Sequence, residues 1–354
     1  MVRMTLSVLS RRGGLPGGEA SETTRRELVD SHGRAIRDVR LSVTDRCNFR
    51  CVYCMEPETR FLPKGELLTA DELTRVAAAC MRLGARRLRI TGGEPTMRPD
   101  LDAIVERLAA LGPDDLAMTS NGTGAGPERL QRWRELGLRR MTYSLDSVTP
   151  GVFTRMTRSN TGSGEVIESV RAAQRAELGP IKINAVVVRG LNEEEVGPLT
   201  LLARELGVEM RFIEFMPLDA GRHWEPGLLV PASEILELAG AAAELVPLGR
   251  ESDSSTSETF AFAGGGPGRI GVIAPVTRPF CGACSRLRIT ADGKVRPCLF
   301  SLEEFDLRGP LRNGASERQL EDVLLEAVWS KQPGHDIGRD GFRQPARGMS
   351  AIGG

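Results

Sequence analysis

The sequence has no excess of charge of either sign and no long apolar run. Its 354 residues include 47 basic and 47 acidic side chains, so the formal net charge is zero. A chain without a global electrostatic field is not drawn to nucleic acid or to a membrane surface, so a polyanion must be held by a local patch. No stretch approaches the roughly 20 apolar residues that cross a bilayer, and no signal-like apolar core occurs near the start. We therefore expect a cytoplasmic protein that binds neither nucleic acid nor a membrane.

The cysteines are few and unevenly placed: two triplets and one single residue make up the seven. An odd number of cysteines in a large chain without a signal peptide argues against a disulfide scaffold. Tight clusters of cysteine instead favour metal ligation by thiolates. The single residue, Cys80, lies on the apolar face of an expected helix, so we predict that it packs in the core.

Short apolar runs alternate with helix-like segments from Asp38 onward. A capping box from Thr69 to Glu72 opens a helix expected over 70–83, and a second helix is expected over 193–206. The expected strands are 39–43, 87–91, 116–119, 140–146, 181–188 and 209–215. This alternation predicts an α/β fold with parallel strands joined by right-handed crossovers. Six repeats are too few for a full eightfold barrel, so the barrel is expected to be open or partial.

Three segments are expected along the chain. Residues 1–36 are rich in Gly, Ser, Thr, Arg and Glu, which predicts a flexible N-terminal extension. Residues 37–217 carry the strand and helix alternation, which fades after Pro217. Residues 218–354 form the expected C-terminal domain, in which 250–268 reads as a loop and 269–273 as a strand.

The first triplet, Cys47-x3-Cys51-x2-Cys54, follows directly on the first expected strand. Three thiolates can hold one side of a four-iron cluster, which leaves one iron free to bind another molecule. The alternative is a zinc knuckle, but a closed structural zinc site needs four ligands and no fourth Cys or His lies nearby. The spacing alone does not decide between the two.

The second triplet, Cys281-x2-Cys284-x13-Cys298, repeats the same pattern far along the chain. A zinc ribbon lacking one ligand, or a cluster completed by another residue such as His335, is the alternative to a cluster with an open iron. Arg286 and Arg288 lie one residue apart, so on an extended strand they share a face. Such a pair suits a polyphosphate or a purine edge.

Two features beside the first triplet favour an iron–sulfur cluster over zinc at this site. Tyr53 directly precedes the third cysteine, and a Gly-Gly-Glu-Pro run, residues 92–95, ends the second expected strand. Together with the triplet they resemble the radical S-adenosylmethionine (SAM) superfamily, in which the CxxxCxxC loop carries a 4Fe-4S cluster and the GGE motif holds the methionine amino group. Further motifs resemble the GTP 3′,8-cyclase family from residue 38 onward. These motifs are residues 40–54, 89–95, 211–216, 280–288 and the terminal pair 353–354.

The resemblance implies a partial (β/α)6 TIM-like barrel with a C-terminal iron–sulfur domain and two 4Fe-4S clusters, one on each cysteine triplet. It implies that SAM is held near Tyr53, Gly93, Ser144 and Met216. It implies GTP contacts at Arg40, Arg89, Thr119, Lys182, Arg286, Leu287 and Arg288. It assigns catalytic roles to Arg286, Arg288, Gly353 and Gly354. Lys182 is one of only four lysines and alternates with apolar neighbours, so it is expected to point away from them.

The implied reaction is a radical cyclisation. An electron from the first cluster cleaves SAM, the resulting 5′-deoxyadenosyl radical removes the C3′ hydrogen of GTP, and the carbon radical attacks guanine C8. The product, (8S)-3′,8-cyclo-7,8-dihydroguanosine 5′-triphosphate, opens molybdenum cofactor biosynthesis. The implied partners are an electron donor of the flavodoxin or ferredoxin type, a downstream cyclic pyranopterin monophosphate synthase and a second copy in a homodimer.

Two rival interpretations stay open on the sequence. A peptide-modifying radical SAM enzyme with an auxiliary cluster usually has more than three C-terminal cysteines, and it does not explain the arginine pair. A zinc or iron–sulfur binding module without turnover does not require the Gly-Gly-Glu-Pro run.

Overall fold

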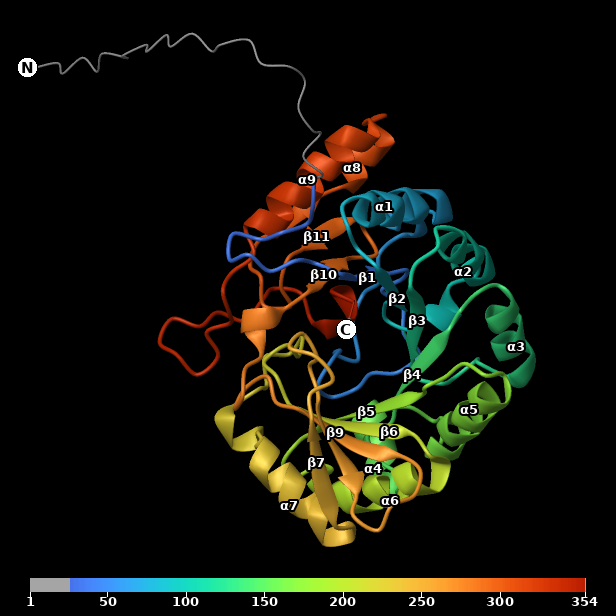
Figure 1. Ribbon diagram of the computed structural model, residues 1–354, viewed down its shortest axis with the longest axis vertical. Coiled ribbons are helices and arrows are strands. Elements are labelled where there is room, and N and C mark those ends of the chain that lie inside the picture. Colours follow the sequence, from blue (N-terminus) through green and yellow to red (C-terminus); the bar gives the residue numbers. More distant parts are fainter. Residues whose placement is uncertain (1–25, 354) are drawn as a thin grey trace, which may run out of the picture.

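The computed structural model describes residues 26–353 as a large sheet bent around a central space with helices on its outside (Figure 1). The strands are β1 (Asp38–Ser42), β2 (Arg87–Thr91), β3 (Asp115–Ser120), β4 (Arg140–Ser144), β5 (Lys182–Val187), β6 (Glu209–Glu214), β7 (Leu245–Gly249), β8 (Glu258–Phe262), β9 (Arg269–Ile273), β10 (Arg286–Ile289), β11 (Lys294–Arg296) and β12 (Phe305–Asp306). The α-helices are α1 (Ala70–Arg82), α2 (Leu101–Ala110), α3 (Pro127–Glu135), α4 (Pro150–Thr157), α5 (Ser163–Arg175), α6 (Val196–Leu206), α7 (Ala232–Ala242), α8 (Arg308–Arg312) and α9 (Glu317–Trp329). Short 3-10 helices are η1 (Lys64–Glu66), η2 (Pro95–Met97), η3 (Glu193–Glu195), η4 (Pro226–Leu228), η5 (Cys281–Ala283) and η6 (Met349–Ala351).

Strands β1 to β6 lie side by side in chain order and are parallel. This is the partial (β/α)6 barrel expected from the strand and helix alternation. Two strands from the C-terminal part extend it: β9 pairs in parallel with β6, and β10 pairs in parallel with β1. Antiparallel β8 and β7 continue beyond β9, and β11 and β12 continue beyond β10. One hydrogen-bonded sheet therefore crosses the expected boundary at residue 217, and the division into two domains there stays a prediction.

The two faces of the barrel strands differ in chemistry. On β1, Val39 and Leu41 are fully buried against the helical layer, whereas Arg40 between them faces the central space. Helices α1, α2, α3, α5 and α6 cover the outer face (Figure 1), and one large apolar cluster fills the layer between sheet and helices. The period of two along each strand therefore places apolar side chains in the core and polar side chains inside the barrel.

Several expectations about single elements are confirmed. Helix α1 begins with the capping box, in which the Glu72 N–H donates to Thr69 Oγ1 and the Thr69 N–H donates to Glu72 Oε2. Cys80 is fully buried on the apolar face of this helix. Strands β2 and β9 have the bounds expected for them.

The expectation of a flexible extension up to residue 36 is wrong for its last part. Leu28 and Ile36 are buried, and the Leu28 N–H donates to Leu83 O at 2.9 Å. A bridge between Val29 and Ala35 closes the segment into a turn. Leu28 and Ile36 help to anchor this segment, and composition averaged over the polar stretch hid them. Residues 1–25 lie outside the described part.

The expectation of a loop over 250–268 is also wrong in part, because it contains β8. This strand pairs with β9, and Phe260 and Phe262 are buried on alternate positions. The Ser, Thr and Gly around the strand concealed its alternation.

The C-terminal residues enter the barrel. Ile352 is fully buried and Gly353 is buried, and the last described residues, coloured dark red, lie near the centre of the ring of strands (Figure 1). In the described part of the chain, no helix has both the length and the apolar character needed to cross a bilayer.

Candidate active site

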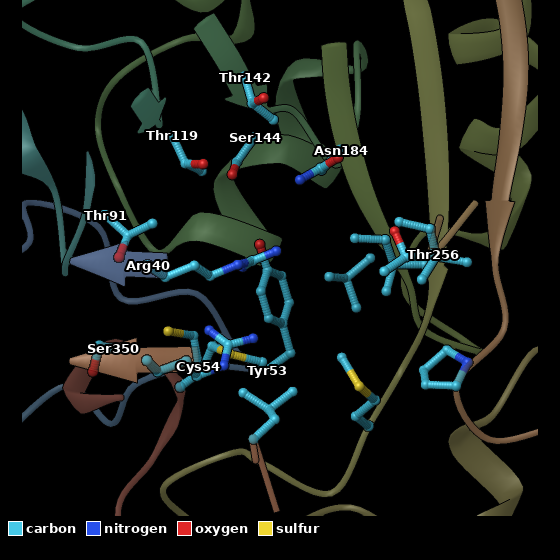
Figure 2. Close-up of a pocket in the computed structure, with 18 of the residues that line it drawn as sticks. Arg40, Tyr53, Cys54, Thr91, Thr119, Thr142, Ser144, Asn184, Thr256 and Ser350 are labelled. Atoms are coloured by element: carbon cyan, nitrogen blue, oxygen red, sulfur yellow. The ribbon is translucent and has the colours of Figure 1, made fainter. Parts of the chain in front are cut away.

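A cavity of about 330 Å³ inside the barrel is lined by all six clustered cysteines. Cys47, Cys51 and Cys54 reach it from the loop that follows β1, whereas Cys281, Cys284 and Cys298 reach it from the C-terminal part of the chain. Two triplets more than 200 residues apart in the sequence thus face the same space. Figure 2 shows polar side chains of β3, β4 and β5 gathered on one side of this pocket, with Cys54 and Ser350 on the other.

Three arginines lie in register across neighbouring parallel strands of this pocket. Arg40 of β1 is paired in register with Arg288 of β10 and with Arg89 of β2, and all three line the cavity. Neighbours in register point to the same face of a sheet, and like charges in such positions repel each other. In the described residues none of the three forms an ion pair with a carboxylate. The row therefore favours an anion between or beside the guanidinium groups.

Burial and repulsion from nearby arginines lower the pKa values in this row, although Arg89 and Arg288 stay protonated at neutral pH. Burial, with smaller contributions from Arg211 and Arg140, lowers the pKa of Arg89 to about 10. Burial and the neighbouring Arg286 lower the pKa of Arg288 to about 10 as well. A bound polyanion reverses both effects, because an opposite charge favours the protonated form.

The loop of the first triplet is held by the glycine pair of the Gly-Gly-Glu-Pro run. The Gly93 N–H donates to Thr44 O and the Glu94 N–H donates to Arg46 O, both at 2.7 Å. A Cβ on Gly93 would lie 2.3 Å from Arg46 O, closer than any side chain allows. Glycine is therefore required here for the contact between two main chains.

Glu94 joins three loops at the carboxyl ends of neighbouring strands. Its carboxylate accepts hydrogen bonds from the Asn121 N–H at 2.6 Å, from Ser120 Oγ at 2.9 Å and from the Thr96 N–H at 3.0 Å. Burial raises the pKa of this carboxyl above its ordinary value. The Asn121 amide then donates to Asn48 Oδ1 within the loop of the first triplet. The acidic residue of the motif thus ties the second and third strand ends to that loop.

Tyr53 and Asp146 form a buried pair beside the first triplet. The Tyr53 hydroxyl donates to Asp146 Oδ2 and the Val186 N–H donates to Asp146 Oδ1, both at 2.8 Å. Burial raises the pKa of Asp146 to about 6. This pair fixes the Tyr53 ring upright in the pocket, where Figure 2 shows it next to Arg40.

The thiols of the two triplets differ in their surroundings. Burial raises the pKa of Cys47 to about 11 and that of Cys54 to about 12, so these thiols become ligands only when a positive group binds them. At Cys284, burial acts in the same direction, but the cations of Lys331 and Arg286 outweigh it and lower the pKa.

The donor sets fit iron–sulfur clusters. Each triplet presents three free thiols to the cavity, and no fourth cysteine joins either of them. Among residues 26–353, no three His, Cys, Asp or Glu side chains converge as on a single metal ion.

Most residues singled out by the sequence line this cavity. They are Tyr53, Gly93, Ser144, Met216, Arg40, Arg89, Thr119, Arg286, Arg288 and the six cysteines. His335 also lines it, and its Nε2 lies 2.6 Å from Pro275 O. The two Arg side chains of β10 share a face, as alternate residues of a strand do.

Four others are not among the residues that line this cavity. Lys182 lines a neighbouring cavity at the amino ends of the strands, where its ammonium group lies 3.2 Å from Glu209 Oε2. Leu287 is fully buried in the core on the other face of β10, so only its main chain is available to a ligand. Gly353 accepts a hydrogen bond from Arg288 through its carbonyl. Gly354 lies outside the described residues.

The sequence reading assigned no role to Arg211, Asn184 or Asp146, which also line the cavity. The signal for the first two was present, because Asn184 on β5 and Arg211 on β6 are polar residues at inward positions of apolar strands. Asp146 follows the end of β4, and only the structure brings it to Tyr53.

Comparisons with known proteins agree with this geometry. The family model of the Radical SAM superfamily matches residues 41–203, and that of Molybdenum Cofactor Synthesis C matches residues 208–337. A GTP 3′,8-cyclase of Streptomyces coelicolor is 44% identical over 338 residues, which are 95% of this chain and 98% of that protein. A GTP 3′,8-cyclase of Rhodopirellula baltica is 42% identical and covers 92% of both chains.

Solved structures share the fold at low identity. Streptococcus suis SuiB bound to its precursor peptide SuiA has a TM-score of 0.61 and 12% identity, covering 85% of this chain and 67% of that one. The protein anSMEcpe with bound AdoMet has a TM-score of 0.53 and 13% identity, covering 84% and 81%. Because identity and coverage are high for the sequence relatives, the chain belongs to the GTP 3′,8-cyclase family of the radical SAM superfamily.

Proposed function

We infer that the protein is a radical SAM GTP 3′,8-cyclase, which converts GTP to (8S)-3′,8-cyclo-7,8-dihydroguanosine 5′-triphosphate in the first step of molybdenum cofactor biosynthesis. One observation carries the inference: one cavity is lined by two triplets of free thiols and by a row of arginines that have no carboxylate partner among residues 26–353. A cluster site alone does not need the arginines, and a nucleotide site alone does not need the thiols.

The first triplet and SAM belong together in this proposal. Cys47, Cys51 and Cys54 hold a 4Fe-4S cluster, which when bound supplies the electron that splits SAM. Tyr53, Gly93, Ser144 and Met216 surround SAM. The support is their position: all four line the cavity beside the triplet, and Tyr53 is locked by Asp146.

GTP is proposed to bind along the arginine row. Arg40, Arg89, Arg286 and Arg288 hold the triphosphate through bidentate contacts, for which a planar guanidinium is suited. Thr119 lies beside Arg89, whose guanidinium donates to its hydroxyl at 3.4 Å. Lys182 and the main chain of Leu287 complete the set, and we add Arg211, which lines both this cavity and the one that contains Lys182.

We propose that Cys281, Cys284 and Cys298 hold a second 4Fe-4S cluster that binds the guanine. The support is the donor set itself, because three thiols facing a ligand cavity leave one position for a substrate atom. The two ends of GTP are then fixed by different chemistries, so the ribose lies between the triplets, where the reacting carbons need near-attack distances of roughly 3–3.5 Å.

The C-terminal tail is proposed to take part in positioning. Ser350 lies beside Cys54 in the cavity (Figure 2). Arg288 donates to Gly353 O. Residues 350–353 therefore connect the first triplet to the arginine row, and Gly353 holds Arg288 in its catalytic position. The catalytic role of Gly354 stays a prediction.

The experiment that tests the function is anaerobic incubation of the reconstituted protein with GTP, SAM and a chemical reductant, followed by mass analysis. We expect 5′-deoxyadenosine and a product with the mass of GTP, because cyclisation is an isomerisation. Release of 5′-deoxyadenosine without a GTP isomer would contradict the assignment. Metal analysis should find about eight irons in each chain if both triplets hold four, and four would contradict the second cluster.

The cellular setting is proposed by the same family membership. We place the protein in the cytoplasm, with an electron donor of the flavodoxin or ferredoxin type, a downstream cyclic pyranopterin monophosphate synthase and assembly as a homodimer. A peptide-modifying activity has weaker support, since the likeness to SuiB extends to the fold alone.

A further inference from the structure

A buried ion pair lies in the N-terminal turn, outside the site described above. Arg34 Nε lies 2.6 Å from Asp30 Oδ2, and the two residues are 8% and 2% exposed. Asp30 Oδ1 also accepts hydrogen bonds from the Arg34 N–H and the His32 N–H, each at 2.9 Å. The carboxylate thus fixes both the turn and the direction of the Arg34 side chain.

The guanidinium group of Arg34 also hydrogen bonds to the main chain of the second triplet. Its guanidinium donates to Cys281 O at 2.8 Å. It also donates to Pro333 O at 2.8 Å and to Gln332 O at 2.6 Å. A planar guanidinium carries five N–H donors in a rigid fork, so one side chain can join these two segments in a fixed geometry. An arginine that served only as the partner of Asp30 would not need three main-chain carbonyl acceptors as well.

Lys331 performs the same task for the other two cysteines. The residue is 3% exposed, and its ammonium group donates to Arg286 O at 2.9 Å and to Pro297 O. Arg286 follows Cys284 by two residues, and Pro297 directly precedes Cys298. The main chain next to every cysteine of the triplet is therefore held by a buried cation.

None of these cysteines lies within an α-helix or a β-strand. Cys281 lies in the short helix η5, Cys284 precedes β10 and Cys298 follows β11. Lys331 makes no ion pair with a carboxylate in residues 26–353. A buried ammonium group is costly without a negative partner, and three thiolates with a bound cluster would supply that charge.

We propose that Arg34, aligned by Asp30, and Lys331 are positioning residues that hold the second triplet in the geometry its metal centre requires. The N-terminal turn then helps to hold the proposed C-terminal metal site in its geometry. We call Arg34 and Lys331 together the clamp. Its role in metal binding rests on the second cluster proposed above, whereas its effect on the main chain does not.

The first test measures the main chain by amide hydrogen exchange and mass spectrometry on the full-length, iron-free protein. Arg34→Met and Lys331→Met should accelerate exchange in peptides covering 279–288 by about tenfold or more, since each removes charged hydrogen bonds. Peptides covering 47–55 should be unchanged. His32→Ala is the matched control, because its exposed side chain accepts or donates none of these bonds. Unchanged exchange over 279–288, or equal acceleration in both regions, would overturn the clamp.

The second test measures iron in two backgrounds of the reconstituted protein. With Cys47, Cys51 and Cys54 replaced by serine, Arg34→Met should release iron to a chelator about tenfold faster. With Cys281, Cys284 and Cys298 replaced instead, Arg34→Met should change nothing. Lys331→Arg should retain more iron than Lys331→Met, because a cation remains. Equal losses in both backgrounds would overturn the proposal.

Two outcomes separate the clamp from the function. If the second triplet binds no iron in any variant, the second cluster is refuted, and the hydrogen-exchange result still decides the clamp. If Arg34→Met does not fold, Asp30→Asn decides, since it keeps one acceptor oxygen and should give the same pattern with a smaller amplitude.

Discussion

At the scale of single residues, the pocket is marked by a row of arginines that form no ion pair with a carboxylate among residues 26–353. Arg40 is the central member of the row, flanked in register by Arg288 and Arg89. The family resemblance predicted Arg40 as a GTP contact, and its place between buried Val39 and Leu41 agrees with an inward position. Its two neighbours in register follow only from the strand order, in particular from the pairing of β10 with β1, which no local pattern contains.

Arg40→Gln should weaken GTP binding about tenfold to a hundredfold, because hydrogen bonds to charged groups contribute about 1.5–3 kcal/mol each. Cleavage of SAM should change much less, since Arg40 is not a ligand of the first triplet. Calorimetry under anaerobic conditions measures the first effect and release of 5′-deoxyadenosine the second. Arg318→Gln on the exposed face of α9 is the control, and equal GTP affinity for Arg40→Gln and parent would refute a role in binding.

Asp146 should make stability depend on pH. Its pKa is about 6 in the folded chain and near 3.8 when unfolded, so the folded state holds a proton that the unfolded state has lost between these values. Stability therefore falls as pH rises through this window, by about 2 kcal/mol between pH 4.5 and 7.

Asp146→Asn should remove that dependence. Urea unfolding across pH 4.5–7 should show the variant gaining about 2 kcal/mol relative to the parent, whereas Asp336→Asn at an exposed position should follow the parent. Parallel curves for Asp146→Asn and the parent would mean that this carboxyl does not titrate in the window.

At the scale of elements, the site depends on loops that follow strands and on how closely they approach. The order of strands β1 to β6 could be predicted from the alternation, and so could the place of the first triplet at the end of β1. The contact between residues 92–94 and the loop of the first triplet could not be predicted. It joins main-chain atoms, and no pattern of side chains in the sequence indicates such a contact. The same holds for β8, whose two buried phenylalanines lie in a polar stretch.

Gly93→Ala should separate these two loops. The added Cβ would meet Arg46 O at 2.3 Å, and overpacking of this kind costs about 1–3 kcal/mol. We expect lower stability and loss of iron from the first triplet, while the second triplet keeps its iron. Gly164→Ala in α5 is the matched control, since its Cβ would enter open space. Normal iron content in Gly93→Ala would contradict a need for close approach.

At the scale of the whole molecule, the N-terminal barrel and the C-terminal part share one sheet. Composition and alternation suggested a boundary near residue 217, because the repeat of strand and helix ends there. Pairing between β6 and β9 and between β1 and β10 is not visible in the sequence, since each joins strands far apart along the chain. The turn over 28–36 was missed for the same reason, as its partners lie near residues 281 and 333.

The two parts should therefore fail to fold separately. A fragment of residues 1–217 would expose the unpaired edges of both β1 and β6, which favours aggregation. The full-length protein should unfold in one transition, measured by calorimetry and by limited proteolysis. A soluble, protease-resistant 1–217 fragment would contradict this prediction.

The pairing of β1 with β10 also determines when the barrel can be completed during translation. Asp38 leaves the ribosome almost 250 residues before its neighbour Arg286, so one margin of the nascent barrel stays uncovered during most of translation. At typical elongation rates of about 5–20 residues per second, that interval lasts roughly 12 to 50 seconds. This margin stays open until β10 has been made, and the second triplet is complete only once Cys298 has followed β11.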